Sequence, residues 1–161
     1  MKNPENRSSF FSSVSEISNL YYKNKFQKYI NEEFNILDFG CGTGELLNLI
    51  KCKYKIGVEI NKFSQKKLKK KKLNYTSNID KITKIKFDTI FALSVIDHTE
   101  YPIAFLKKLK NKLKKNGNII IIIRHDSKNQ DVENSSYKQH LYSWSRLSFT
   151  NLLNKVGLKV Y

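Results

Sequence analysis

The sequence contains few cysteines and no long apolar run. Cys41 and Cys52 are the two cysteines among its 161 residues, and their spacing matches no zinc motif. We therefore expect neither a disulfide framework nor a bound metal, and the low cysteine count suits a cytoplasmic protein. The longest uninterrupted apolar run, Ile119 to Ile123, has the length of a buried strand and is too short to span a membrane.

The first residues also lack the apolar core of a signal peptide, which again favours the cytoplasm. A chain of 161 residues can bury one hydrophobic core but is too short for two ordinary domains. No linker and no internal repeat divides it. We expect a single domain over 1–161, with an N-terminal helical segment at 1–33 and an α/β core at 34–161.

Arginine is scarce, although the net charge is +16 at pH 7. The chain has 27 Lys and 3 Arg, with 17 Asn and 17 Ile against 2 Ala. An adenine- and thymine-rich genome produces this composition in any protein that it encodes. Arginine is the preferred reader of phosphates and guanines. We therefore interpret the lysines at 66–72 and 107–115 as solvated faces, with a nonspecific, salt-sensitive affinity for nucleic acid.

A glycine-rich segment is the most informative feature that the sequence does contain. The apolar residues 34–37 precede Asp38-Phe39-Gly40-Cys41-Gly42-Thr43-Gly44, and a helical pattern follows at 45–50. Alternate glycines allow positive φ angles and let a ligand come close to the backbone. A dinucleotide fingerprint would place another glycine where this chain has Glu45. The segment favours an adenosine-containing cofactor without a pyrophosphate. Cys41 is either a small residue that fills the turn or a reactive thiol.

A second predicted strand, at 54–60, ends with a carboxylate. Glu59 follows the start of the glycine turn by about 20 residues, where a carboxylate accepts hydrogen bonds from both ribose hydroxyls. Strand and helix patterns then alternate along the chain, after a predicted helix near 14–31. This alternation is typical of a parallel sheet with helices on both faces. Ligands bind such sheets at the carboxyl ends of the strands.

These segments resemble the class I S-adenosylmethionine-dependent methyltransferases. The letters ILDFGCGTG are similar to the first motif of that family, and GVEIN is similar to its second. Phe87 to His98 resembles the fourth strand and its site loop, and 102–123 resembles the next helix, a glycine turn and the fifth strand. The letters HLYSW at 140–144, with 152–158, resemble the ending of a bacterial subgroup associated with surface-glycan or small-molecule methylation.

The resemblance implies an α/β fold: a doubly wound, Rossmann-like, mostly parallel sheet with helices on both faces. It also implies S-adenosyl-L-methionine as the cofactor. The family's sheet ends with a sixth strand and an antiparallel seventh, and we expect a C-terminally shortened sheet without the seventh strand. A loop or a second copy, in a homodimer, would then cover the exposed edge. The expected cofactor-binding residues are Asp38, Gly40, Cys41, Gly42, Gly44, Glu59, Ile60, Asn78, Ile79, Leu93 and Ser94.

The histidines supply the candidates for acid–base chemistry. Asp97-His98 stands where the family carries Glu-His, and His98 is either a base or acceptor contact or a packed loop histidine. His125 lies just past the fifth strand, at the edge of the site. Asp97, His98 and His125 are the catalytic candidates. Trp144 and His140 either close over the core or form a wall of the acceptor pocket.

An adenine contact is expected after the third strand, where either Asn78 or Asp80 could supply it, and we favour Asn78 with Ile79. The leading functional hypothesis is methyl transfer to a small-molecule or glycan acceptor. Charge favours RNA as an alternative acceptor, and the short C-terminus favours a noncatalytic cofactor-binding or partner module. A nicotinamide dehydrogenase is disfavoured by Glu45 in the final glycine position.

Overall fold

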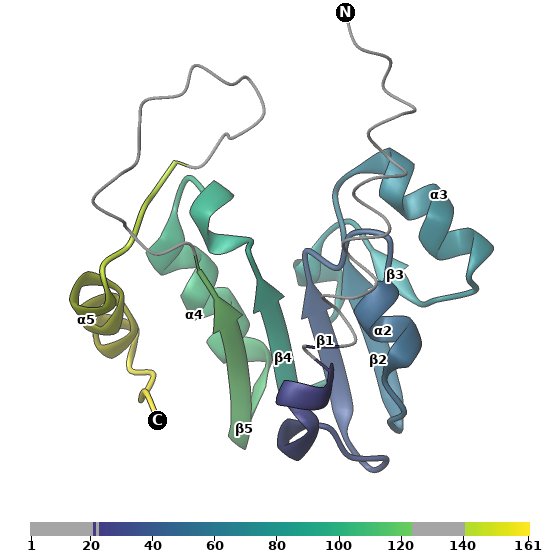
Figure 1. Ribbon diagram of the computed structural model, residues 1–161, viewed down its shortest axis with the longest axis horizontal. Coiled ribbons are helices and arrows are strands. Elements are labelled where there is room, and N and C mark those ends of the chain that lie inside the picture. The colour runs from purple at the N-terminus through teal and green to yellow at the C-terminus, as the bar shows by residue number, and fades with distance from the viewer. Residues whose placement is uncertain (1–20, 22, 124–140) are drawn as a thin grey trace, which may run out of the picture.

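A parallel sheet forms the centre of the computed structural model, which describes Tyr21, residues 23–123 and residues 141–161. Its five strands lie in the order β3-β2-β1-β4-β5, and every neighbouring pair is parallel (Figure 1). The strands are β1 (Asn35–Phe39), β2 (Tyr54–Val58), β3 (Tyr75–Thr76), β4 (Phe87–Leu93) and β5 (Leu113–Ile122). This order confirms the doubly wound, Rossmann-like sheet.

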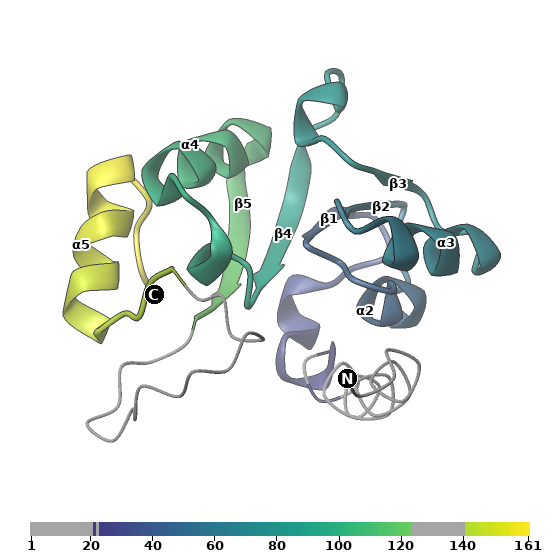
Figure 2. The ribbon, with the colours of Figure 1, turned by 90° about the horizontal axis from the view of Figure 1, so that it is seen from above.

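Helices cover both faces of the sheet. Viewed from above, α2 and η1 lie on one side of the strands and α4 on the other (Figure 2). The expected helix near 14–31 is described only in part, since residues 14–20 and 22 lie outside the described residues; positions 23–25 are helical. The α-helices are α2 (Glu45–Leu49), α3 (Lys62–Lys70), α4 (Pro102–Lys112) and α5 (Arg146–Val156), and the 3₁₀ helices are η1 (Gln27–Tyr29), η2 (Ile79–Lys81) and η3 (Ile96–His98).

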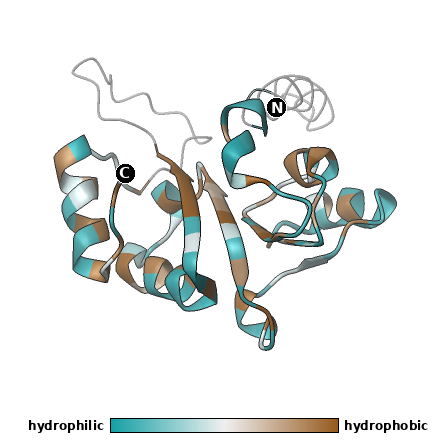
Figure 3. Cartoon of the chain, turned by 90° about the horizontal axis from the view of Figure 1, so that it is seen from below, coloured by the Kyte–Doolittle hydropathy of each residue, from teal (hydrophilic) through white to brown (hydrophobic). Residues whose placement is uncertain are grey.

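The core has two sides because successive residues of a strand face opposite ways. Ile36 of β1 packs with Leu46 of α2, whereas its neighbour Leu37 packs with Ile90 of β4 and Leu109 of α4. A strand buried on both faces needs a continuous apolar run. The second half of β5 is such a run, and Figure 3 shows it as hydrophobic, in contrast to the hydrophilic first half.

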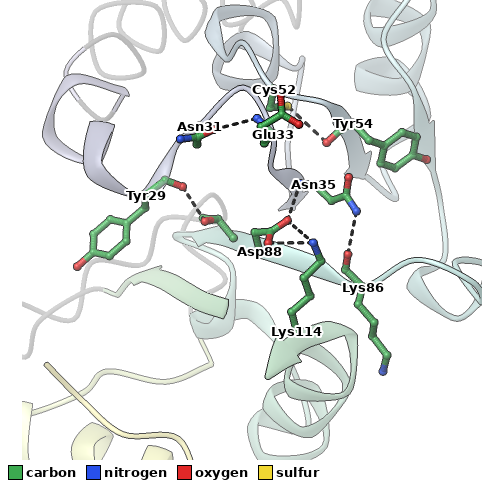
Figure 4. Close-up of polar contacts among 10 residues, drawn as sticks. Tyr29, Asn31, Glu33, Asn35, Cys52, Tyr54, Lys86, Asp88 and Lys114 are labelled. Carbon is green, nitrogen blue, oxygen red and sulfur yellow. Dashed lines mark hydrogen bonds and ion pairs between the residues drawn. The ribbon is translucent and has the colours of Figure 1, made fainter. Parts of the chain in front are cut away.

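The beginning of β5 differs from the sequence prediction of a strand at 119–123. The strand starts at Leu113, and its register against β4 shifts between the pairs Phe87↔Leu113 and Thr89↔Asn118. The glycine turn expected before the strand is therefore an irregularity within it. Lys114, near the start of the strand, lies with its Nζ 2.8 Å from a carboxylate oxygen of Asp88 on β4 (Figure 4). Among the described residues, β5 is an outer strand of the sheet.

Both ends of α5 are capped. Ser145 accepts a hydrogen bond from the Ser148 amide at 3.1 Å and caps the start of the helix. Gly157 ends the helix with φ of +73°, a left-handed conformation that favours glycine. Within the described ranges, no helix is both long enough and apolar enough to cross a membrane.

Thr89 fastens the segment before β1 to the middle of the sheet. Its buried hydroxyl donates a hydrogen bond of 2.6 Å to the backbone oxygen of Tyr29. We expect Thr89→Val to lower the free energy of unfolding by about 1–3 kcal/mol, because the Tyr29 oxygen would lose its partner. Urea denaturation measures this change, and Thr83→Val at an exposed position is the matched control. Equal stability of the two variants would contradict the assigned role of Thr89.

Candidate functional site

The site is built around the turn between β1 and α2. The amides of Gly40 and Cys41 both donate to the backbone oxygen of Val58, at 2.8 and 3.2 Å, and the Gly44 amide donates to the Cys41 oxygen at 2.9 Å. Gly40, Gly42 and Gly44 have φ angles of +73°, +54° and +79°. Residues other than glycine rarely adopt such φ angles, so the turn depends on its glycines.

Packing distinguishes Gly42 from the other glycines of the turn. A Cβ atom added to Gly40 would lie 2.3 Å from a methyl group of Val95, and one added to Gly44 would lie 2.4 Å from a methyl group of Leu68. A Cβ added to Gly42 would meet nothing within 4 Å. Gly42 therefore borders open space, where a ligand can reach the backbone closely. This is the fit that an adenosine cofactor requires.

Glu59, just past β2, joins this turn to the next loop. Its side chain is 9% exposed; Oε2 accepts from the Gly42 amide at 2.8 Å and Oε1 accepts from the Asn61 amide at 2.7 Å. Each carboxylate oxygen has a further lone pair for another donor. The Gln65 side chain also holds the Glu59 backbone oxygen, at 2.7 Å. The carboxylate is thus fixed beside the open space at Gly42.

Asp38 brings a second carboxylate into the same region. It is 4% exposed, and burial followed by the charge of Glu59 raises its pKa to about 7. Burial, and then the charges of Asp38 and Glu59, also raise the pKa of the Cys41 thiol. A thiol with a raised pKa is a poor nucleophile. A Cβ added to Gly57 would lie 2.3 Å from the Cys41 sulfur, so Cys41 fills the space beside β2.

The loop after β3 contains Asn78 and Asp80, the two residues that the sequence offers as adenine contacts. The Asp80 carboxylate forms an ion pair with Lys108 of α4 at 2.8 Å. Asn78 is exposed, and its Oδ1 accepts from the Asp80 amide at 2.9 Å, which leaves its Nδ2 group to donate. Ile79 is 5% exposed and packs in the core, so its backbone is the part that a ligand could contact.

Exposed apolar side chains lie beyond the end of β2. Ile60 is 79% exposed and Phe63 is 56% exposed. Ile60 was expected at the site from its place in the motif. Phe63 was not, because a single aromatic residue in the first turn of a helix resembles an ordinary helix position. Both could cover a flat apolar ring, and such exposed apolar groups are often functional.

The loop after β4 separates the two catalytic candidates that the structure describes. Leu93 is half-buried, and Ser94 has φ of +54° while its amide donates to the Ile122 oxygen at 2.9 Å. In η3, Asp97 is 1% exposed, whereas His98 is exposed. His98 is therefore accessible to an acceptor, whereas Asp97 is buried. His125 and His140 lie outside the described residues.

No group of His, Cys, Asp and Glu side chains in the described part of the chain is arranged to hold a metal ion. Trp144 belongs to the other side of the loop, where it stacks on Tyr142 with ring centroids 5.3 Å apart and packs against the α4–α5 cluster. The structure therefore brings together Asp38, the glycine turn, Glu59 and the ends of β3 and β4.

Comparisons with known proteins agree with this geometry. The solved structure of a SAM-dependent methyltransferase from Archaeoglobus fulgidus is 21% identical with a TM-score of 0.68; the match covers 88% of this chain and 68% of that one. The plantazolicin methyltransferase BamL, solved with SAH, is 22% identical with a TM-score of 0.68; the match covers 97% of this chain and 68% of BamL. A putative methyltransferase from Bacillus halodurans is 13% identical with a TM-score of 0.70, covering 89% and 68%.

These likenesses concern the fold, and the chain spans about two thirds of the length of each of these solved chains. No curated protein sequence matches it. The family model described as a methyltransferase domain matches residues 16–161. The chain therefore belongs to the class I S-adenosylmethionine-dependent methyltransferases, and S-adenosyl-L-methionine is its cofactor.

Proposed function

We propose that this chain transfers a methyl group from S-adenosylmethionine to a small-molecule or sugar acceptor. The observation that carries the proposal is the hydrogen bond of 2.8 Å from the Gly42 amide to Glu59, beside the open space at Gly42. A cofactor without phosphates needs a close backbone approach and a ribose acceptor. Both features occur here at one point of the molecule.

The proposed cofactor contacts follow from the groups that each residue presents. The remaining lone pairs of Glu59 accept from the ribose hydroxyls. The Asp38 carboxylate faces the cationic part of the cofactor, and Asn78 with Ile79 meets the adenine edge. Ile60 covers the adenine ring. The glycine turn, with Leu93 and Ser94, borders the rest of the molecule.

The bound cofactor supplies an activated methyl group, so the protein has to orient an acceptor and accept its proton. His98 is the exposed titratable group on the loop after β4. We propose that its imidazole takes the proton of an acceptor hydroxyl or ammonium, and that Asp97 beneath it supports the loop. His125 stays a candidate from the sequence alone.

A small acceptor is favoured over RNA by two considerations. BamL was solved with a triazolic desmethylPZN analogue, and a coclaurine N-methyltransferase of related fold was solved with N-methylheliamine. In this chain, several lysines of the basic surface bind backbone oxygens or carboxylates of the fold itself. RNA is therefore included among the acceptors to be tested.

Cofactor binding is the first test. We expect S-adenosylmethionine and its demethylated product to bind the chain with micromolar affinity in a calorimetric titration. Glu59→Ala should weaken binding by about 100-fold, because it removes charged hydrogen-bond acceptors. Gly42→Arg should abolish it by filling the open space. Glu32→Ala, at an exposed position, is the control. Unchanged binding in Glu59→Ala would contradict the assigned ribose site.

Asp38 gives a pH dependence whose sign is fixed by its raised pKa. An unfolded aspartate ionises near pH 4, whereas Asp38 in the folded protein ionises near 7. The ligand-free fold is therefore favoured below pH 4 and loses stability as the pH rises to 7, by up to about 4 kcal/mol. We expect Asp38→Asn to remove this loss in urea denaturation at a series of pH values.

The exposed Asp80→Asn variant controls for general charge effects. A stability difference between the wild type and Asp38→Asn that does not change with pH would rule out this explanation. Cofactor affinity offers a second measurement, because a cationic ligand binds the ionised carboxylate. Binding of S-adenosylmethionine should tighten by about tenfold from pH 6 to pH 8 in the wild type, a change that Asp38→Asn should lack.

His98 is tested by turnover. With labelled S-adenosylmethionine and a panel of sugars, small metabolites and RNA, we expect the transfer of label to a small acceptor. His98→Gln should lower kcat by about 100-fold, the usual contribution of a general base, with cofactor affinity unchanged. Full activity in this variant would show that His98 is only a packed loop residue. Transfer of label to RNA alone would replace the small-acceptor proposal.

A further inference from the structure

The segment just before α5 packs against the turn that carries Asp97 and His98. The Leu141 amide donates to the Asp97 backbone oxygen at 2.7 Å. The Tyr142 hydroxyl donates to the Glu100 backbone oxygen at 3.1 Å. These contacts hold the turn on both sides of His98, although Tyr142 lies 42 positions after Glu100 in the sequence.

An aromatic series anchors Tyr142 to α5. Its ring stacks on Trp144 with centroids 5.3 Å apart, and Trp144 meets Phe149 edge-on at 5.4 Å. Phe149 is 8% exposed and shares a buried cluster with Ile96, the first residue of η3. Aromatic pairs in these geometries are favourable beyond the area that they bury. The ring of Tyr142 is thus linked through Trp144 and Phe149 to α5.

The backbone of the turn is closed by short-range hydrogen bonds. These include one from the His98 amide to the Val95 oxygen at 3.1 Å and one from the Thr99 amide to the Ile96 oxygen at 3.2 Å. A 3₁₀ helix of one turn has poor hydrogen-bond geometry. The buried Thr99 Oγ1 and Trp144 Nε1 have no hydrogen-bond partner among the described residues, so they add no polar link between turn and segment.

We propose that Tyr142 is a positioning residue that holds the η3 turn, and with it the His98 imidazole, in the orientation that meets the acceptor. This inference rests on the proposed function of His98. Two parts of Tyr142 act together. The ring is fixed by Trp144, and the hydroxyl carries that fixed position to the backbone at Glu100. Loss of the hydroxyl alone should therefore loosen the turn without disturbing the aromatic series.

The test compares Tyr142→Phe with Tyr101→Phe. The first variant keeps the ring stack and removes the hydrogen bond. The second makes the same change at a side chain that is 72% exposed. In Tyr142→Phe we expect the His98, Thr99 and Leu141 amides to exchange hydrogen about fivefold faster by NMR, since one hydrogen bond is lost. The Leu37 amide in β1 should not change.

The imidazole signals of His98 provide a readout that general structural support would not move. They should shift in Tyr142→Phe and stay in place in Tyr101→Phe. Calorimetric binding of the demethylated cofactor should be equal in both variants. With an active acceptor, Tyr142→Phe should lower kcat by about fivefold and leave the KM for the cofactor unchanged.

The exchange and imidazole measurements need no acceptor, so they separate this inference from the proposed function. Failure of the wild type to transfer a methyl group would refute the proposed function and leave the exchange result to decide the role of Tyr142. Unchanged exchange at His98 and Thr99 would overturn the inference. Faster exchange with an unmoved His98 imidazole would also overturn it, because Tyr142 would then support only the backbone.

Discussion

The carboxylate of Glu59 is the constraint on which the cofactor site depends. One oxygen accepts a hydrogen bond from the Gly42 amide at 2.8 Å, and the other accepts one from the Asn61 amide at 2.7 Å. Asn61 in turn caps α3 by accepting from the amides of Phe63 and Ser64. A single side chain therefore fixes the glycine turn, the end of β2 and the start of a helix. It also places a negative charge beside Asp38, whose pKa rises to about 7 because of burial and of that charge. A cationic ligand would relieve this repulsion, so the same arrangement that costs stability in the free protein favours a sulfonium cofactor.

The lysines show why net charge is a poor guide to function here. Helix ends leave backbone oxygens without partners, and lysine side chains can satisfy them. The Lys55 ammonium group donates to the backbone oxygens of Leu47 and Ile50 at the end of α2, both at 2.7 Å. Lys110 of α4 donates to the oxygen of Val156, the last residue of α5, at 2.9 Å. Part of the charge of +16 therefore serves the fold. A basic composition with these internal uses does not by itself indicate a nucleic-acid surface.

Local patterns in the sequence predicted the sheet, the glycine turn and the place of Glu59, because each depends on residues close together in the chain. The caps of α5 were predictable for the same reason. Contacts between distant segments were not. The ion pair of Asp80 with Lys108 joins residues on different elements. The ion pair of Lys114 with Asp88 likewise joins the neighbouring strands β5 and β4. No periodic pattern records such pairs. The difference in burial between Asp97 and His98 could not be predicted either, since adjacent polar residues in a short turn give no sign of which one is buried.

The cofactor side and the acceptor side of the site meet at Gly40. A Cβ atom at this position would lie 2.3 Å from a methyl group of Val95, so the glycine turn and the start of η3 are in direct contact. The Val95 backbone oxygen also accepts a hydrogen bond from the His98 amide at 3.1 Å. From the opposite side, Tyr142 holds the Glu100 oxygen at 3.1 Å. The turn that carries His98 is therefore held between a glycine that permits close packing and a tyrosine fixed by aromatic neighbours. A larger residue at Gly40 would therefore move this turn, so one short glycine segment bears both on the open space at Gly42 and on the position of His98.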